Sequence, residues 1–564
     1  MRLERFARYF LIGAPVALGL WIIACLWFPL TDTDIWWHLA SAKLIWAHEA
    51  FLRTDPFSQV SLGAPWIDLH WGFQMWAYGL WNSGGDTWLV GGKCLALLAG
   101  VGLILWPHWS RHSAFLLFPL TAFGVYHIRF YLDVRPLAVT LLILSSQYAV
   151  MQGYFQKKLT RPWLAIFPLQ IILVNTQGLY PLGAFLISSL VLGEWLAHRT
   201  GKIQSKIVWR PWILTCTALW LCGFVSPYGW KAFQLPGIIF GRIVPVSGNI
   251  FSSGIAENQP FLELSRQHPW QALPLVCFVT LVLYTFRRNW ERSIGYLLIF
   301  IAFTVLGLMA IRNLPLTILA GLMAAGHNLQ LLGGLEKMGA ENRGQQARLS
   351  FLHLGGGLVA FFAVVLLYGP ELKHAWAYEL PGNLETPFRY PSLAVDYLEK
   401  HPIPGPIFNE LRYGGYLEFR MFPDKMAFVD GRMVLRTKSF YRDFLEVTDH
   451  PEGFSRYRDK YDFTHALLPI SEDRRFLPLA AYLLRVEGWD LLHCDGASAL
   501  LSAPGVAVAW ALPLDSLPAN HPIRVALQAR FQANPRLEAL GRRNVADFLM
   551  AGGKARAAQY ALIP

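Results

Sequence analysis

Long apolar segments dominate the first 370 residues of this chain. About eleven stretches are long enough, or nearly so, to cross the roughly 30 Å hydrocarbon core of a bilayer, and the fifth and seventh are short. They lie at residues 9–30, 88–106, 113–128, 134–152, 163–174, 179–197, 212–225, 270–287, 293–310, 314–332 and 349–368. The pattern predicts a polytopic α-helical membrane protein.

After residue 370 the pattern changes. Short β-rich runs alternate with helical patterns over residues 371–505, which predicts a small α/β domain. The runs lie at residues 406–408, 426–429, 465–468 and 499–501. Residues 506–564 look helical, with a breaker at Asn534-Pro535, and predict a short helical tail that could form one repeat-like hairpin. We therefore expect three domains, at residues 1–370, 371–505 and 506–564.

Two loops of the membrane domain are long, at about residues 31–87 and 226–269. Long loops on one face of a membrane protein usually carry function. Near the start of the first loop, apolar residues recur at helical spacing, which predicts a helix lying in the membrane interface. These residues are Ile35, Leu39, Ala42 and Trp46.

The distribution of Lys and Arg predicts the orientation. With the N-terminus in the cytoplasm, the inside segments carry 17 basic residues and the outside loops carry 8. Cytoplasmic loops of membrane proteins are enriched in Lys and Arg. The first long loop and the whole C-terminal region are therefore expected outside. The first apolar segment follows a basic start and is too long for a cleaved signal peptide, so we interpret it as a retained signal anchor.

The composition supports this class of protein. Of 564 residues, 54% are hydrophobic and 15% are charged, with a mean hydropathy of +0.34. The net charge of +12 arises entirely before residue 371, because the remainder carries 23 basic and 23 acidic side chains. Without a soluble basic patch, a nucleic-acid partner is not expected. Five of the six cysteines lie in predicted spans, so no disulfide framework is indicated.

The stretch from Thr31 to His38 places two carboxylates at a membrane exit. Asp34 could cap a helix that starts at Ile35, because a side-chain oxygen there accepts backbone N–H groups. Such a capping role is less natural for Asp32, which is therefore the sharper candidate. Either carboxylate could instead act as a general base or bind a metal ion at the mouth of a lipid-facing cleft.

Other polar and aromatic side chains of the first loop are candidates for substrate binding. The histidines are more often structural interface residues, Asp55 suits a turn, and the tryptophans suit an interfacial belt. Tryptophan rings would equally stack on a sugar. The candidates are Trp36, Trp37, His38, Asp55, Asp68 and His70.

Three arginines fall at outside ends of predicted spans, namely Arg129, Arg135 and Arg312. Such arginines usually anchor lipid headgroups. They would also bind a phosphate or pyrophosphate through paired N–H groups. Apart from Lys93, few ionisable residues lie in the middle of a predicted span, whereas transporters often have ionisable residues at that depth.

Short motifs follow one another in a fixed order over roughly residues 31–500. They are Asp34-Ile35-Trp36-Trp37-His38-Leu39, Thr54-Asp55-Pro56-Phe57-Ser58, Val134-Arg135-Pro136, Ser226-Pro227-Tyr228-Gly229, Arg312-Asn313-Leu314-Pro315, Asn409, Gly414-Gly415-Tyr416 and Val429-Asp430-Gly431-Arg432. Each motif is weak by itself, but the ordered set resembles the GT-C superfamily of membrane glycosyltransferases, and more closely a little-characterised bacterial GT-C-like family. Two positions depart from such proteins, with Gln177 where a His is common and Trp71-Gly72 where Glu-Trp is common.

The resemblance implies a GT-C-like fold of about eleven spans with an extracytoplasmic C-terminal α/β domain in a bacterial cytoplasmic (inner) membrane. It implies transfer of a sugar from a polyprenyl-phosphate donor to a glycan, lipid or protein acceptor, with inversion, in the cell envelope. Asp32 or Asp34 would be the base, and the arginines would hold the phosphate. Some GT-C relatives bind a divalent metal (Mg or Mn) on such acids and others use none.

Three alternatives stay open from sequence. The chain could be a non-enzymatic component of polysaccharide assembly or export that keeps the same fold. It could be a small-solute or lipid transporter, although paired broken helices and a polar midplane are not evident. In the third alternative the soluble domain is the functional part, and Asp430-Gly431-Arg432 is either its site or a strand-end turn with an Asp–Arg pair.

Overall fold

The computed structural model describes residues 2–110, 113–203, 208–288, 290–339, 343–376, 386–471, 475–506 and 511–563. It is mostly helical and divides into two compact units. The first, here called the membrane unit, contains Met1–Phe28 and Leu89–His374. The second contains Pro29–Trp88 and Ala375–Pro564. We call it the composite unit, because it joins two distant parts of the sequence.

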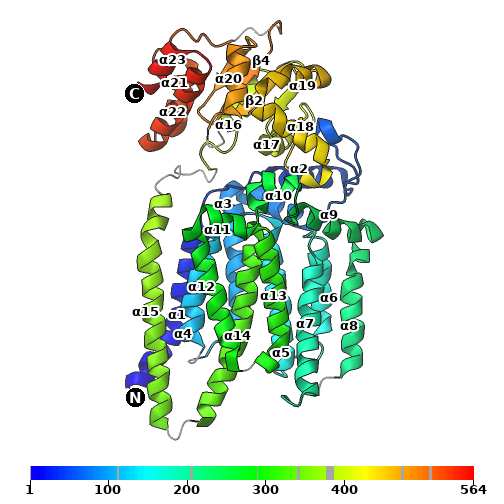
Figure 1. Ribbon diagram of the computed structural model, residues 1–564, viewed down its shortest axis with the longest axis vertical. Helices are drawn as coiled ribbons and strands as arrows, with labels where there is room; N and C mark the ends of the chain where they lie inside the picture. Colours follow the sequence, from blue (N-terminus) through cyan, green and yellow to red (C-terminus); the bar gives the residue numbers. More distant parts are fainter. Residues whose placement is uncertain are drawn as a thin grey trace. The chain divides into compact units, whose positions relative to one another are not determined.

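Long apolar helices make up the membrane unit and run side by side in Figure 1. Its main helices are α1 (Arg2–Leu26), the second part of α3 (Trp71–Leu105), α4 (Ala114–Ile128), α5 (Pro136–Phe155), α6 (Trp163–Val174), α7 (Pro181–Arg199), α8 (Trp209–Leu221), α12 (Pro269–Thr285), α13 (Ile294–Met309), α14 (Leu314–Gly339) and α15 (Arg343–Trp376). Shorter helices α9 (Gln234–Ile243), α10 (Ile250–Gly254) and α11 (Phe261–Gln267) lie in the second long loop.

Four helices of the described residues are long and apolar enough to cross a membrane, which makes the chain a multi-pass membrane protein. A fifth is counted if Trp209–Val225 and Gly229–Ile243, which are bent by 113°, form one span. Three shorter apolar helices follow the predicted pattern, at Gly13–Leu26, Trp163–Val174 and Ile294–Met309. The predicted number of about eleven spans and their orientation stay predictions.

Small residues bring helices of the membrane unit close together. Helix α13 packs on α14 and α7. At the α7–α13 crossing, a Cβ on Gly193 would lie 2.3 Å from the backbone N of Gly295. Only glycines allow this approach, and such small-residue contacts are typical of helix pairs in membranes, where burial from water no longer drives association.

A four-stranded sheet lies in the composite unit, in the order β1-β2-β4-β3. Strand β1 (Ile407–Asn409) is parallel to β2 (His465–Pro469), whereas β4 (Ser498–Ser502) is antiparallel to both β2 and β3 (Asp490–Cys494). Three of the four predicted β-runs are therefore strands of this sheet. The prediction for 426–429 was wrong, since this segment makes only an isolated bridge from Ala427 to Ser58 of the first loop.

Helices of the composite unit pack around this sheet. They are α16 (Ser392–Lys400), α17 (Leu411–Met421), α18 (Lys438–Asp449), α19 (Phe454–Tyr461) and α20 (Leu477–Arg485), followed by α21 (Pro522–Phe531), α22 (Pro535–Ala551) and α23 (Ala555–Leu562). The last three belong to the same hydrophobic core as the sheet. For example, the ring centroids of Phe388 and Phe531 lie 4.8 Å apart.

The first loop contributes helix α2 (Asp34–His48), which packs on α17. Trp36 is buried against Tyr416 and Tyr390, with ring centroids 4.8 and 5.6 Å away. A helix was predicted here, but its surroundings were not. A helix lying on a bilayer would bury one face, whereas α2 buries nine of its fifteen residues inside the composite unit.

Candidate functional site

The two carboxylates of the first loop differ in their environment. Asp32 is buried, and its Oδ1 accepts the backbone N–H of Asp34 at 3.0 Å. Asp34 is the first residue of α2 and is partly exposed. Of the two interpretations left open for Asp34, the helix cap does not hold, because α2 starts at Asp34 itself and Thr33 is its N-cap residue. The local turn is closed by Asp32, and the Asp34 side chain sits in the first turn, where the helix dipole favours a negative charge.

Asp34 lies directly against the turn Asp430-Gly431-Arg432. A Cβ placed on Gly431 would come 2.1 Å from Asp34 Oδ1. A second close approach is nearby, because a Cβ on Gly415 of α17 would lie 2.9 Å from the backbone N of Trp37. Gly431 and Gly415 are therefore explained by how closely α2 approaches the C-terminal half of the chain, whereas a Cβ on Gly414 would instead lie 2.0 Å from the carbonyl oxygen of Val429.

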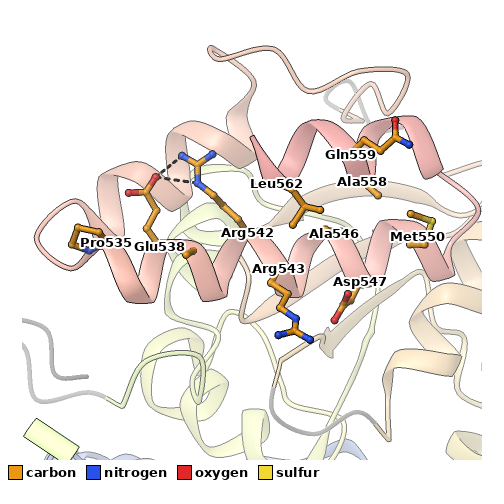
Figure 2. A pocket seen from close by; sticks show the side chains of 11 residues that line it. Pro535, Glu538, Arg542, Arg543, Ala546, Asp547, Met550, Ala558, Gln559 and Leu562 are labelled. Carbon is orange, nitrogen blue, oxygen red and sulfur yellow. Dashed lines mark hydrogen bonds and ion pairs between the residues drawn. The ribbon is translucent and has the colours of Figure 1, made fainter. Parts of the chain in front are cut away.

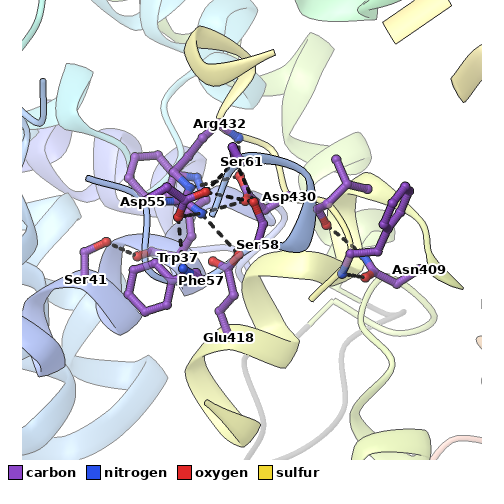
Figure 3. Close-up of polar contacts among 12 residues, drawn as sticks. Trp37, Ser41, Asp55, Phe57, Ser58, Ser61, Asn409, Glu418, Asp430 and Arg432 are labelled. Atoms are coloured by element: carbon purple, nitrogen blue, oxygen red, sulfur yellow. Dashed lines mark hydrogen bonds and ion pairs between the residues drawn. The ribbon is translucent and has the colours of Figure 1, made fainter. Parts of the chain in front are cut away.

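The turn is anchored by a buried cluster of charges, shown in Figure 3. Arg432 Nη2 lies 2.7 Å from Asp430 Oδ2, 2.8 Å from Asp55 Oδ1 and 3.3 Å from Glu418 Oε1. Asp430 Oδ1 also accepts the backbone N–H of Arg432 at 2.7 Å, so the same carboxylate shapes the turn. Arg436 Nη2 adds a bond to Asp430 Oδ2 at 2.7 Å.

Serines and aromatic rings complete the surroundings of these charges. Ser58 donates to Asp55 Oδ2 at 2.8 Å and accepts from Arg436 at 3.0 Å, and Ser61 contacts the same two residues. The Arg432 guanidinium also lies 4.6 Å from the ring centroid of Trp66. Such contacts add cation–π stabilisation where water is excluded.

Burial and pairing set the protonation states of the cluster. Burial raises the pKa of Glu418 well above its ordinary value, with a further rise from Asp430. Although burial opposes it, the Arg432 and Arg436 guanidiniums hold the pKa of Asp430 well below its ordinary value. With Glu418 neutral, two carboxylates balance two guanidiniums. A buried ionic cluster is tolerated when its charges are paired and hydrogen-bonded in this way.

Backbone pairing joins the first loop to the same region. Gln59 and Val60 donate backbone N–H groups to the carbonyls of Ala427 and Phe428, at 2.9 and 3.3 Å. On the other side, the buried Asn409 side chain accepts from Phe428 N at 2.7 Å and donates to Val429 O at 2.8 Å. The segment at 427–429 is thus held by a loop and an amide side chain in place of neighbouring strands.

A second polar cluster of the composite unit contains the predicted histidines. Gln74 donates to Asp68 Oδ1 at 3.0 Å and lies 3.5 Å from His38 Nδ1. His70 Nδ1 lies 3.7 Å from Asp68 Oδ1, and the rings of His38 and His70 are 5.6 Å apart. Trp37 packs on both histidines. The structure therefore brings together four of the predicted substrate-binding residues, whereas Asp55 belongs to the charge cluster.

The three predicted arginines lie in the membrane unit. Arg135 makes a bidentate pair with Glu257, with one N–O distance of 2.7 Å. Arg129 donates to the carbonyl of Tyr126 at 2.8 Å and lies 3.9 Å from Glu371. Arg312 lies in a short 3₁₀ turn at Ile311–Asn313 and is partly buried. A phosphate at Arg135 would have to compete with Glu257.

The membrane unit also contains a polar network that sequence reasoning missed. His108 bonds to Gln330 Oε1 at 2.7 Å and to the Tyr148 hydroxyl at 2.6 Å. Nearby, Gln152 donates to Tyr296 at 2.7 Å. A lone His or Gln within an apolar run gives no signal of its partner. Interhelical hydrogen bonds of this kind hold membrane helices together.

Lys93 of α3 is the other buried ionisable residue noted from sequence. Its side chain is fully buried in the membrane unit, and Nζ lies 3.5 Å from the ring centroid of Phe28. Among the described residues, Nζ has no hydrogen-bond partner. The Lys93 amino group therefore lies over the face of the Phe28 ring, away from water.

The residues that could hold a divalent metal do not form a sufficient set. Divalent Mg or Mn prefers several oxygen ligands. Within the described ranges, no group of three or more His, Cys, Asp or Glu side chains is arranged to hold a metal ion. One oxygen of Asp32 is already bonded to the backbone. The residues described do not fit the metal that the resemblance allows at Asp32 and Asp34.

A cavity of about 640 Å³ lies elsewhere, between α22 and α23. Figure 2 shows its lining, where Glu538 and Arg542 form an ion pair and Met550 and Leu562 supply apolar surface. None of the predicted site residues lines this cavity.

Comparisons with known proteins give structural likenesses only. No family model and no curated protein matches the chain. The structure is similar to the archaeal oligosaccharyltransferase AglB from Archaeoglobus fulgidus in complex with an inhibitory peptide and a dolichol-phosphate, at 12% identity and TM-score 0.49, covering 93% of this chain and 78% of that one. It is also similar to ArnT from Cupriavidus metallidurans bound to undecaprenyl phosphate, at 12% identity and TM-score 0.47, covering 90% and 99%. Both neighbours are GT-C superfamily membrane glycosyltransferases. At this identity and TM-score the likenesses assign no activity to this chain.

Proposed function

We propose that this protein is a membrane glycosyltransferase that moves a sugar from a polyprenyl-phosphate donor to an acceptor hydroxyl. We place the reaction at the outer face of a bacterial cytoplasmic membrane, with an acceptor that is a glycan, a lipid or a protein. The observation that carries the proposal is the position of Asp34, a partly exposed carboxylate in the first turn of a helix that is otherwise buried.

The proposed chemistry follows from this carboxylate. Asp34 takes the proton of the acceptor hydroxyl, and the acceptor oxygen forms a bond to the anomeric carbon from the face opposite the leaving group. The bond from that carbon to the phosphate oxygen breaks, and polyprenyl phosphate leaves with the electron pair. The configuration is inverted. Asp32 orients the turn that carries Asp34, through its bond to the Asp34 backbone N–H.

We assign substrate-binding roles to residues of each unit separately. In the membrane unit, Arg129, Arg135 and Arg312 bind the donor phosphate through charge-assisted hydrogen bonds. In the composite unit, the cluster of Trp37, His38, Asp68 and His70 is assigned to substrate contact, and Trp36 holds α2 against α17. No step is routed through a metal ion.

The test is transfer from a lipid-linked sugar donor by purified full-length protein. Asp34→Asn should lower kcat by roughly 100-fold or more, because general-base catalysis contributes 10²–10⁴-fold. Asp32→Asn should lower it less. Asp396→Asn, a carboxylate of the composite unit that pairs with Arg420, is the matched control. If Asp32→Asn and Asp34→Asn both keep full activity at normal expression, the mechanism is wrong and a non-enzymatic assembly or export role is favoured.

A further inference from the structure

The turn Asp430-Gly431-Arg432 lies next to the Asp34 carboxylate. The hypothetical Cβ of Gly431 would lie 2.1 Å from Oδ1, 3.3 Å from Cγ and 3.8 Å from Oδ2 of Asp34. A real Cβ does not approach an oxygen so closely. The backbone of Gly431 therefore lies close against Oδ1 of Asp34 and sterically limits where this oxygen can lie.

The residues on either side hold the Gly431 backbone in position. Asp430 and Arg432, which flank the glycine, are both within the buried charge cluster. Arg432 is held on another side by Asp55 of the first loop, the loop that also carries Asp34. The first loop and the turn at Gly431 are thus joined a second time, by the buried ion pair between Asp55 and Arg432. Side chains fixed through such supporting bonds keep a reacting group within a narrow range of positions.

We propose that Asp430-Gly431-Arg432 is a positioning element for the Asp34 carboxylate, so that the C-terminal half of the chain supplies part of the catalytic site. The inference rests on the proposed function, because it assumes that Asp34 is the base. Gly431 limits where the carboxylate can lie, and Arg432 and Asp430 hold Gly431. None of the three is proposed to contact the substrate.

Displacing the catalytic base should lower kcat more than it weakens substrate binding. Misplacing a reacting group by about 1 Å can cost roughly 100-fold in rate. Gly431→Ala adds a methyl group next to Asp34 Oδ1 and therefore displaces the Asp34 carboxylate. The matched control is Gly453→Ala, also in the composite unit, where an added Cβ meets nothing within 4 Å and φ is −76°.

The experiment measures kcat, KM for the lipid-linked donor and Tm on full-length protein. Gly431→Ala should lower kcat roughly 100-fold with KM changed less than about threefold, and Gly453→Ala should change neither. A folded Gly431→Ala protein with wild-type kcat would overturn the inference. So would a kcat loss that only matches a smaller folded fraction.

A double-mutant cycle separates this inference from the proposed function. If the contact is real, Asp34→Ala should recover at least half of the Tm that Gly431→Ala loses, because the added methyl group then has room. Additive Tm changes would overturn the positioning role. Full activity of Asp34→Asn would instead contradict the proposed function, whatever the cycle shows about the contact.

Discussion

Arg432 and Asp55 form a buried ion pair at 2.8 Å, although they come from opposite parts of the sequence. Both side chains are at most 1% exposed. Through this pair the first loop and the C-terminal half behave as one folded unit. Its stability therefore depends on residues that lie on both sides of the membrane-unit segment Leu89–His374 in the chain.

Removing Arg432 should be far more costly than removing a surface arginine. Arg432→Met leaves Asp55 and Asp430 without their main partner, and breaking a buried pair from one side costs about 3–5 kcal/mol. Arg458→Met removes the partner of Asp459 and of Glu487, which both stay in reach of water, and should cost about 0–1 kcal/mol. Thermal unfolding of purified protein in detergent measures both. Equal losses would show that the buried cluster contributes no more than a surface pair.

Glu418→Gln should stabilise the protein increasingly as the pH rises. The folded-state pKa of Glu418 is raised above its ordinary value of 4.5, so the folded state holds the proton more tightly than the unfolded state. The wild-type contribution is fully present below pH 4.5 and is lost as the pH rises through the folded pKa. The Tm difference between variant and wild type should therefore grow from pH 4.5 to pH 8.

The control for that pH series is Glu399→Gln, at a 40% exposed carboxylate of the same unit. A Glu418→Gln difference that stays flat with pH, or that shrinks, would show that Glu418 is ionised within the folded cluster.

Deleting residues 511–564 should unfold the composite unit. Leu517, Ile523, Leu527 and Phe531 are buried in the same core as the sheet. Losing such side chains costs about 1.5–3 kcal/mol each, which together approaches the whole stability of a typical domain, about 5–15 kcal/mol. Limited proteolysis of purified protein should show rapid loss of the region after residue 386. A core that stays protease-resistant would instead support residues 371–505 as an independent domain.

Glu257→Gln should improve donor binding if Arg135 holds the phosphate. The wild-type carboxylate accepts from both Nη1 and Nη2 of Arg135, and so occupies a guanidinium edge that a phosphate would use. A neutral amide competes less, so the KM for the lipid-linked donor should fall by roughly three- to tenfold. Glu263→Gln, a carboxylate of the same region that pairs with Arg266, serves as the control. A KM that rises would assign Arg135 to helix anchoring.

Local patterns predicted a good part of this fold. Apolar runs indicated the membrane helices, and β-rich runs indicated β1, β2 and β4. Strand β3 was missed because Asp490 and His493 interrupt its apolar pattern. The run at 426–429 has the composition of a strand, but its partners are Ser58 to Val60 and the Asn409 side chain. Such pairing depends on chain segments that only the folded structure brings together.

The site was predicted less completely, for a related reason. Asp34, Asp55 and Asp430-Gly431-Arg432 were each singled out, but nothing local relates a carboxylate in the first loop to an arginine 377 positions later. Arg436 and Glu418 carry no motif of their own. The spacing of four between Arg432 and Arg436 was the one available signal, because both side chains converge on Asp430.

The discontinuity of the composite unit has a consequence for its synthesis. Ribosomes add about 5–20 residues per second, so Arg432 is made roughly 20 to 75 seconds after Asp55. During that interval the first loop has no partner to fold against, because Asp55, the tryptophans and helix α2 contact residues that have not yet been synthesised. A nascent chain that stalls before Arg432 would present these residues to proteases and chaperones. The completion of the last third of the polypeptide thus sets the time at which the first loop can mature.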